Sequence, residues 1–304
     1  MGQLVRGVWT ADADFPRDAD GRFDRAASQF RDMHVEPVAG RYHLYVSLAC
    51  PWAHRTLVAR ALLGLEHAID VSIVEPVWQD NGWQFSDRYP DRLHGARYLW
   101  ELYVRARADF TGRVTVPVLW DRERDTIVNN ESAEILRLLH TAFAPLARTP
   151  RDLVPEPHRA DIDAINARVY EAVNNGVYKC GFAGTQAAYD EAEAALFAAL
   201  DELDATLAGR TWLVGDALTE ADIRLFPTLV RFDAVYNIHF KCSRKRLVDY
   251  PNLLSHTVRM YRLPGVADTV DFDHIKRHYY LCHRSLNPRG IIPVTGQGAY
   301  LRLA

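Results

Sequence analysis

YHLYVSLACPWAHRTL, residues 42–57, joins a β-rich run to a stretch whose apolar residues recur at helical spacing. Residues 42–47 are of types favoured in strands, and the helical spacing continues through residues 51–63. A second β-branched run follows at 69–74. The pattern predicts a strand, a helix and a second strand, with a right-handed crossover that makes the two strands parallel in one sheet.

Cys50 lies at the junction between the first strand and the helix, and Pro51 takes the first helical position, where a missing N–H costs nothing. Unpaired amides and the positive end of the helix dipole favour a thiolate at such a junction. The residue three positions on is Ala53, so a CxxC disulfide cannot form. We therefore interpret Cys50 as a reactive thiol whose covalent partner is an external thiol such as glutathione, rather than as a buried inert cysteine.

The next segment extends the sheet. Residues 75–113 carry many aromatic side chains among charges and turn residues, which indicates an inserted lid or loop. Apolar runs at 114–120 and 126–128 flank a polar turn and predict an antiparallel hairpin. Val116-Pro117 stands where thioredoxin-like folds carry a cis proline. In such folds the residue before the proline pairs with an extended ligand through its main chain.

A helix is predicted over residues 131–143, with side-chain acceptors from Asn129 and Asn130 at its start. Glu131 and Ser132 add a carboxylate and a hydroxyl to the free amides of this helix end. Such a combination suits an amino-acid head group that carries both charges. A simple helix cap is the alternative, and it explains the asparagines but not the combination.

The second half of the chain is helical in pattern. Prolines and mixed charges around 146–157 break the periodicity and mark a domain boundary. Residues 187–207 have the apolar spacing of an amphipathic surface helix. Thr219 and Asp222 form a capping pattern before another apolar helix, and residues 287–304 are rich in Gly and Pro and are expected to be extended.

Bulk properties exclude several classes of partner. A chain of 304 residues suggests two domains, and its 48% hydrophobic and 25% charged residues are ordinary for a folded chain. A net charge of −3 makes nucleic acid an unlikely partner.

With no signal peptide and no run of about 18 apolar residues, we expect a cytoplasmic protein with no membrane partner. Its other three cysteines are expected to be reduced and unreactive: Cys180, Cys242 and Cys282. Because Cys50 and His54 are too few ligands for a metal, none is expected.

From residue 41 to residue 293 the chain resembles the glutathionyl-hydroquinone reductases, also called xi-class glutathione transferases. Besides residues 42–57, the motifs that carry this resemblance are GRVTVPVLWD, TIVNNESAEI, VNNGVYKCGFA, TEADIRLFPTLVRFDAVY, HFKC, DYPNL and HIKRHYY. The resemblance implies an α/β plus all-α fold, an N-terminal thioredoxin-like domain followed by a glutathione-transferase-type helical domain. The expected parts are an arm at 1–40, the thioredoxin-like domain at 41–150, the helical domain at 151–286 and a tail at 287–304.

The same resemblance implies roles for single residues. Cys50 is the nucleophile, and the glutathione contacts fall on Trp83, Arg113, Val114, Thr115, Val116, Glu131 and Ser132. Three tyrosines would surround the cysteine and an aromatic substrate: Tyr178, Tyr236 and Tyr279. Of these, Tyr178 is expected to protonate the departing ring, and the other two to donate hydrogen bonds to the thiolate. Glutathione is a cosubstrate, and a homodimer is expected.

The implied reaction is the reduction of a glutathionyl-hydroquinone through a mixed disulfide of Cys50 and glutathione. A conjugating transferase normally holds the glutathione thiolate with a hydroxyl, so the cysteine at position 50 argues against it. A general glutathione thiol-transferase or a dehalogenase-type enzyme is a second alternative. A non-catalytic interaction module is a third, but it leaves the Cys-Pro turn unexplained.

Overall fold

The computed structural model describes residues 2–11, 16–294 and 301. Their contacts divide the chain into two units. The first unit contains Met1–Phe15, Ala26–Arg151 and Asp273–His278, and the second contains Pro16–Arg25, Asp152–Phe272 and Tyr279–Ala304. Two short segments therefore belong to a different unit from their neighbours in sequence.

A four-stranded sheet of order β4-β3-β5-β6 forms the core of the first unit. Its strands are β3 (Tyr42–Val46), β4 (Ile69–Ile73), β5 (Val118–Asp121) and β6 (Thr126–Asn129). β3 pairs with β4 in parallel and with β5 antiparallel, and β5 pairs antiparallel with β6. All five residues of β3 are buried, as a central strand covered on both faces requires. The predicted βαβ unit and the hairpin are confirmed.

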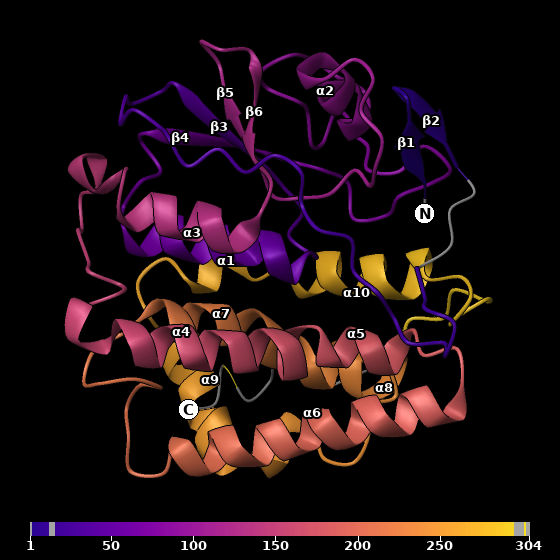
Figure 1. Cartoon of the computed structure of the whole chain (residues 1–304), viewed down its shortest axis with the longest axis vertical. Coiled ribbons are helices and arrows are strands. Elements are labelled where there is room, and N and C mark those ends of the chain that lie inside the picture. Colours follow the sequence, from indigo (N-terminus) through magenta and orange to yellow (C-terminus); the bar gives the residue numbers. More distant parts are fainter. Residues whose placement is uncertain (1, 12–15, 295–300, 302–304) are drawn as a thin grey trace. The chain divides into compact units, whose positions relative to one another are not determined.

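Two helices lie side by side against one face of this sheet: α1 (Pro51–Leu62) and α3 (Ser132–His140) (Figure 1). Cys50 is the N-cap of α1 and is still extended, with a ψ of 120°, and Pro51 takes the first helical position. Gly64, with a φ of 63°, lets the chain turn out of the helix in the left-handed conformation. Glu131 is the N-cap of α3. The helix expected over 131–143 is therefore present and ends at His140.

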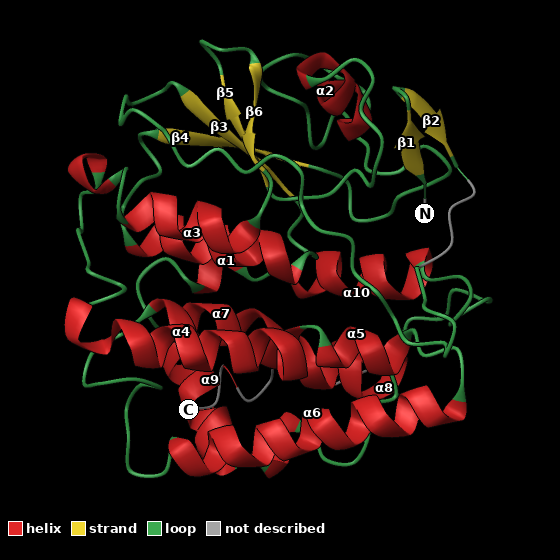
Figure 2. Ribbon diagram, viewed as in Figure 1, coloured by secondary structure: helices red, strands yellow, loops and turns green. Residues whose placement is uncertain are grey.

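Two features of the first unit were not predicted. One is α2 (Leu99–Ala106), which lies beside β6 within the segment interpreted as a lid (Figure 2). The other is a hairpin of β1 (Gln3–Val5) and β2 (Val8–Thr10), in the arm expected at 1–40. Leu4 and Gly112 exchange main-chain hydrogen bonds of 2.9 and 3.0 Å. The hairpin is thus joined to a residue more than a hundred positions away, and no local pattern reveals that contact.

Helices make up the regular structure of the described part of the second unit (Figure 2). Its α-helices are α4 (Arg159–Arg168), α5 (Gly176–Gly181), α6 (Gln186–Thr206), α7 (Glu220–Arg231), α8 (Asn237–His239) and α9 (Pro251–Tyr261), and α10 (Phe272–Cys282) is shared with the first unit. The π-helical turns η3 (Val169–Asn174) and η4 (Phe232–Tyr236) follow α4 and α7. Shorter 3-10 turns complete the two units: η1 (Ala144–Leu146), η2 (Glu156–His158), η5 (Leu247–Asp249) and η6 (Ala267–Thr269).

The predicted capping box opens α7, which is buried along nearly its whole length. The carboxylate of Asp222 accepts hydrogen bonds from the Thr219 amide at 2.9 Å and from the Leu213 amide at 3.0 Å. His256 on α9 lies 2.9 Å from the same carboxylate. The capping residue therefore also ties a loop and a second helix to the central helix of this unit.

Candidate active site

The thiol of Cys50 lies between a helix end and a proline turn of the first unit. Its Sγ accepts a hydrogen bond from the amide of Ala53 at 3.5 Å and can donate one to the carbonyl of Val116, also at 3.5 Å. The Val116-Pro117 peptide bond is cis, as predicted. Cys50 is partly exposed. A half-buried sulfur at a helix N-terminus, next to the residue before the proline, is a favourable setting for a reactive thiolate.

The loop before the proline is held by Tyr103 of α2. Its hydroxyl donates to the carbonyl of Thr115 at 2.8 Å and accepts from the amide of Thr115 at 3.2 Å. Asn130 donates to the same hydroxyl at 3.1 Å. The main chain of Thr115 is therefore engaged by the protein itself, and the unpredicted helix α2 acts as a support for the loop.

Glu131 and Ser132 lie together at the start of α3, as predicted. The Glu131 carboxylate caps the helix by accepting from the amide of Ala133 at 3.2 Å, and it also accepts from the hydroxyl of Ser28 at 3.1 Å. The hydroxyl of Ser132 accepts from the buried guanidinium of Arg55 at 3.3 Å. Ser28 and Arg55 were missed by sequence reasoning, although Arg55 stands inside the quoted motif of residues 42–57.

Trp83 belongs to an aromatic cluster with Trp78 and His278. The His278 ring stacks on Trp83 with centroids 4.9 Å apart and an angle of 15°, and Trp78 meets Trp83 edge-on at 4.8 Å. The Nδ1 atom of His278 lies 2.8 Å from the carbonyl of Pro76. Because His278 comes from α10, its place beside Trp83 could not be read from the sequence.

The three predicted tyrosines meet in the second unit. The hydroxyl of Tyr279 lies 2.7 Å from that of Tyr178 and 2.9 Å from that of Tyr236. Tyr236 and Tyr279 are fully buried, whereas Tyr178 is partly exposed. Burial raises the pKa of both buried phenols well above the ordinary value, so they stay protonated at neutral pH.

Both π-helical turns lie next to this tyrosine cluster. η4 ends at Tyr236, and η3 ends shortly before α5, which carries Tyr178. Such turns are rare and occur frequently at functional sites. Phe182 and Phe240 pack against Tyr178, with ring centroids 6.2 and 5.3 Å from its own. The result is an aromatic setting in which Tyr178 is the most exposed of the three tyrosines.

The remaining cysteines are present as thiols. Cys180 and Cys242 are buried, and Cys282 is partly exposed. Burial, together with the neighbouring Cys180 thiol, raises the pKa of Cys242 well above its ordinary value. Within the described ranges, no group of three or more metal-ligating side chains gathers. Among the same residues, no helix is long and apolar enough to cross a membrane.

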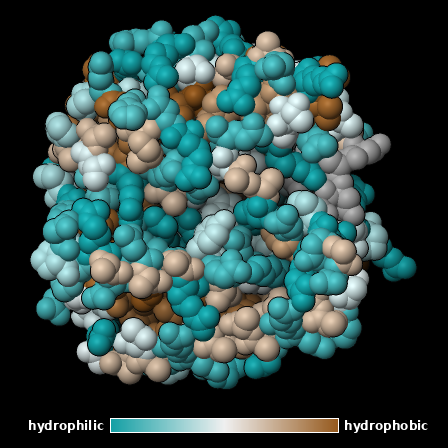
Figure 3. All heavy atoms as spheres, in the orientation of Figure 1, coloured by the Kyte–Doolittle hydropathy of each residue, from teal (hydrophilic) through white to brown (hydrophobic). Residues whose placement is uncertain are grey.

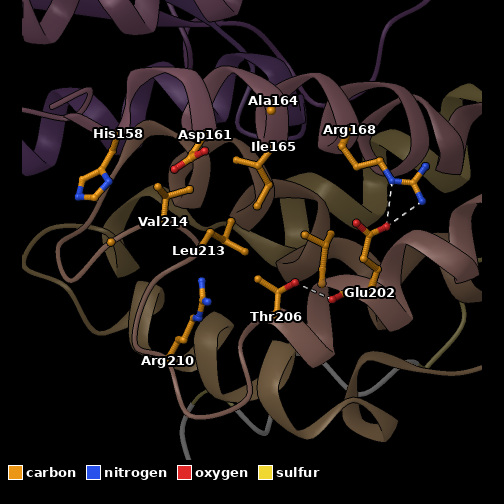
Figure 4. A pocket seen from close by; sticks show the side chains of 12 residues that line it. His158, Asp161, Ala164, Ile165, Arg168, Glu202, Thr206, Arg210, Leu213 and Val214 are labelled. Carbon is orange, nitrogen blue, oxygen red and sulfur yellow. Dashed lines mark hydrogen bonds and ion pairs between the residues drawn. The ribbon is translucent and has the colours of Figure 1, made fainter. Parts of the chain in front are cut away.

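A separate pocket of about 500 Å³ lies in the second unit, between α4, α6 and the loop at 213–215 (Figure 4). Hydrophobic atoms gather between α4 and α6 on the face drawn in Figure 3. An ion pair of Arg168 and Glu202 at 2.9 Å spans one side of the pocket. The residues that line this pocket include neither Cys50 nor any of the three tyrosines.

The first unit, with its thiol beside a cis proline, and the helical second unit define a glutathione transferase. Models of the N-terminal and C-terminal domains of glutathione S-transferase match residues 49–142 and 186–257. The predicted fold class is thereby confirmed.

Comparison with individual proteins narrows this class. The chain is 52% identical over 300 residues to glutathionyl-hydroquinone reductase PcpF of Sphingobium chlorophenolicum, covering 97% of this chain and 96% of that protein. It is 48% identical over 311 residues to glutathionyl-hydroquinone reductase YqjG of Escherichia coli, covering 97% and 95% of the two chains. The chain belongs to the glutathionyl-hydroquinone reductases, the xi class of glutathione transferases.

Solved structures agree with this assignment. The xi-class enzyme of Natrialba magadii superposes with a TM-score of 0.92 at 50% identity, covering 97% of this chain and 94% of the other. The glutathione-bound structure of Escherichia coli YqjG gives a TM-score of 0.87 at 48% identity, covering 97% and 95%.

Proposed function

We propose that this protein reduces glutathionyl-hydroquinones to hydroquinones with glutathione as cosubstrate, and that Cys50 is its nucleophile. One observation carries the proposal: a partly exposed thiol caps a helix beside a cis-proline loop, and the residue three positions on is Ala53, so no CxxC pair can resolve the thiol. An external thiol must then complete the cycle. The names of the relatives PcpF and YqjG support the choice of substrate.

The reaction has two halves. In the first, the Cys50 thiolate attacks the glutathionyl sulfur, a disulfide bond forms, and the electron pair of the broken carbon–sulfur bond stays on the ring. That ring carbon takes a proton from an acid. In the second half, the thiolate of another glutathione attacks the mixed disulfide, which releases glutathione disulfide and restores the Cys50 thiolate. The proton lost by this glutathione replaces the one given to the ring.

Glutathione is proposed to bind through main-chain and head-group contacts in the first unit. The main chain of Val116, next to the thiol, suits pairing with the extended tripeptide. Glu131 and Ser132 are the proposed contacts of its charged head group. The remaining proposed contacts are Trp83, Arg113, Val114 and Thr115.

Tyr178 is the proposed acid. Its partial exposure supports this choice, because Tyr236 and Tyr279 are sealed from solvent and hold their protons strongly. The two buried phenols are proposed as hydrogen-bond donors that stabilise an anion formed during the reaction, first of all the thiolate.

Intact mass spectrometry after incubation with glutathione disulfide tests the nucleophile. We expect one glutathione adduct on the native protein and none on Cys50→Ser. Turnover of a glutathionyl-hydroquinone panel, followed by the release of glutathione disulfide, tests the substrate class. If Cys50→Ser still reduced these compounds, the proposed mechanism would be wrong. If the native protein only exchanged small mixed disulfides, it would be a general thiol-transferase.

We also propose that the protein is cytoplasmic and forms a homodimer, as the family resemblance implies. Sedimentation velocity at micromolar concentration tests the dimer, for which we expect twice the mass of the chain.

A further inference from the structure

Arg25 places a positive charge against the ring of Tyr178. Its guanidinium carbon lies 4.8 Å from the centroid of the Tyr178 ring and 5.2 Å from that of Phe23. Both contacts are within the second unit, to which Pro16–Arg25 belongs. A cation within about 6 Å of an aromatic centroid is attracted by the electron density of the ring face.

The guanidinium is tied to the helix that carries the tyrosine. Its Nε donates a hydrogen bond of 2.9 Å to the side chain of Asn175, which is the N-cap of α5. The ring of Phe23 stacks with that of Tyr178, with centroids 6.2 Å apart and an angle of 28°. The hydrogen bond to Asn175 and the two ring contacts therefore fix the position of the Arg25 guanidinium relative to the Tyr178 ring.

Several other groups surround the Tyr178 hydroxyl. Tyr279 contacts it directly, and Tyr236 is the next phenol in the chain of hydroxyls. The buried guanidinium of Arg231 lowers the pKa of both buried tyrosines against the larger effect of burial. On α5 itself, Lys179 is paired with Glu171. The imidazoles of His239 and His283 lie behind Tyr279, with centroids 6.5 and 5.4 Å from its ring. The guanidinium of Arg25 lies over the ring of Tyr178 itself.

We propose that Arg25 is a positioning residue for the acid, which holds the Tyr178 ring and stabilises the negative charge that the phenol acquires when it gives up its proton. This inference rests on the proposed function, because it requires Tyr178 to be the acid. The step is balanced: the O–H bond of Tyr178 breaks, a C–H bond forms on the ring, and the charge moves to the Tyr178 oxygen. Water then returns the proton that the second glutathione has lost.

The test compares Arg25→Met with Arg25→Lys in the full-length protein. Loss of the cation should slow kcat for a glutathionyl-hydroquinone by about 3- to 30-fold, with no change in KM for glutathione. Arg25→Lys keeps a cation and should recover part of the rate. Arg22→Met is the matched control, since Arg22 lies on the same segment, is exposed and pairs with Glu191, and its loss should change nothing.

The pH profile provides a readout that a merely structural role would not move. Without the guanidinium, the tyrosinate is less stable, so the phenol holds its proton to higher pH. We expect the alkaline limb of kcat to shift upward by about 0.4–1.5 pH units in Arg25→Met. Any pH dependence of kcat that arises from ionisation of the substrate hydroquinone should be the same in the variant and the native protein, because the substitution does not change the substrate.

Tyr178→Phe separates the failure of this inference from the failure of the proposed function. If Tyr178→Phe is as fast as the native protein, the acid is wrongly assigned. If Tyr178→Phe is slow while Arg25→Met keeps the native rate and pH profile, the inference about Arg25 is wrong. Arg25→Met in the Tyr178→Phe background should add little to the loss, and a full additional loss would also contradict the inference. Exchange of a small mixed disulfide needs no acid, so every Arg25 variant should carry it out at the native rate. A loss of this exchange would show that the variant is misfolded.

Discussion

The surroundings of Cys50 in the first unit and those of Tyr178 in the second are built from different parts of the chain. The Sγ atom of Cys50 makes two hydrogen bonds with main-chain groups, the amide of Ala53 and the carbonyl of Val116. Tyr178 is contacted by polar side chains, the hydroxyl of Tyr279 and the guanidinium of Arg25. A site made of main chain tolerates substitution of its neighbours, because their amides and carbonyls remain. A site made of side chains loses a partner with each substitution.

Cys50→Ala should have the largest effect, because it removes the proposed nucleophile. We expect reductase turnover to fall by more than about 10³-fold. Glutathione binding, measured by calorimetry, should remain nearly native because main-chain and head-group contacts hold the tripeptide. Loss of binding and turnover together would show that the variant is misfolded or that the site is wrongly placed.

Tyr178→Phe should come next and should affect only one kind of substrate. General acids contribute about 10²–10⁴-fold, so release of the hydroquinone should slow by that factor. A small mixed disulfide leaves as a thiolate that needs little protonation, so its exchange should continue at the native rate. Stopped-flow measurement of both substrates checks the difference. Equal slowing of the two would mean that Tyr178 supports the thiol and that the proton comes from elsewhere.

Glu131→Gln sharpens the comparison, since it removes a charge from a side-chain contact inside the first site. A charge-assisted hydrogen bond to the ammonium group of glutathione is worth about 1.5–3 kcal/mol, so KM for glutathione should rise about 10- to 150-fold. The amide keeps an oxygen for the Ala133 cap. Glu134→Gln, in the first turn of the same helix, is the control and should leave KM unchanged. An unchanged KM in Glu131→Gln would make Glu131 a helix cap only.

The smallest effect concerns stability, because each unit buries a neutral histidine. Burial lowers the pKa of His43 and of His239 to about 4. Since the unfolded chain binds these protons more readily, the free energy of unfolding should fall as the pH drops from about 6.5 toward 4, by about 1.4 kcal/mol per pH unit for each histidine. Above pH 6.5 the contribution is complete.

Urea unfolding at pH 7 and pH 5.5 measures this dependence. His43→Gln and His239→Gln should each weaken it, whereas exposed His34→Gln should not. A pH dependence that survives in both variants would assign it to other groups.

Arg122 fixes the protonation of His43 in a way that the sequence does not show. It donates to Nδ1 at 3.2 Å, so the other ring nitrogen carries the hydrogen and donates to Ser72 at 2.8 Å. This arrangement is lost when the ring takes a second proton, which is why acid should weaken the sheet here.

The sequence by itself determined the βαβ unit, the place of Cys50 at the start of α1, the cis proline and the caps of α3 and α7. Each of these depends on residues a few positions apart, where periodicity, a capping side chain or a proline restricts the backbone directly. The three tyrosines could be predicted as site residues only through the family resemblance, because nothing in their spacing along the chain indicates that they meet.

Only the tertiary structure decided which distant residues meet: Leu4 with Gly112, Trp83 with His278, and Tyr178 with both Tyr279 and Arg25. These contacts join segments that carry no local signal for one another. Whether such segments meet depends on how whole helices and strands bury their apolar faces, and that free energy is a property of the complete fold rather than of any short stretch.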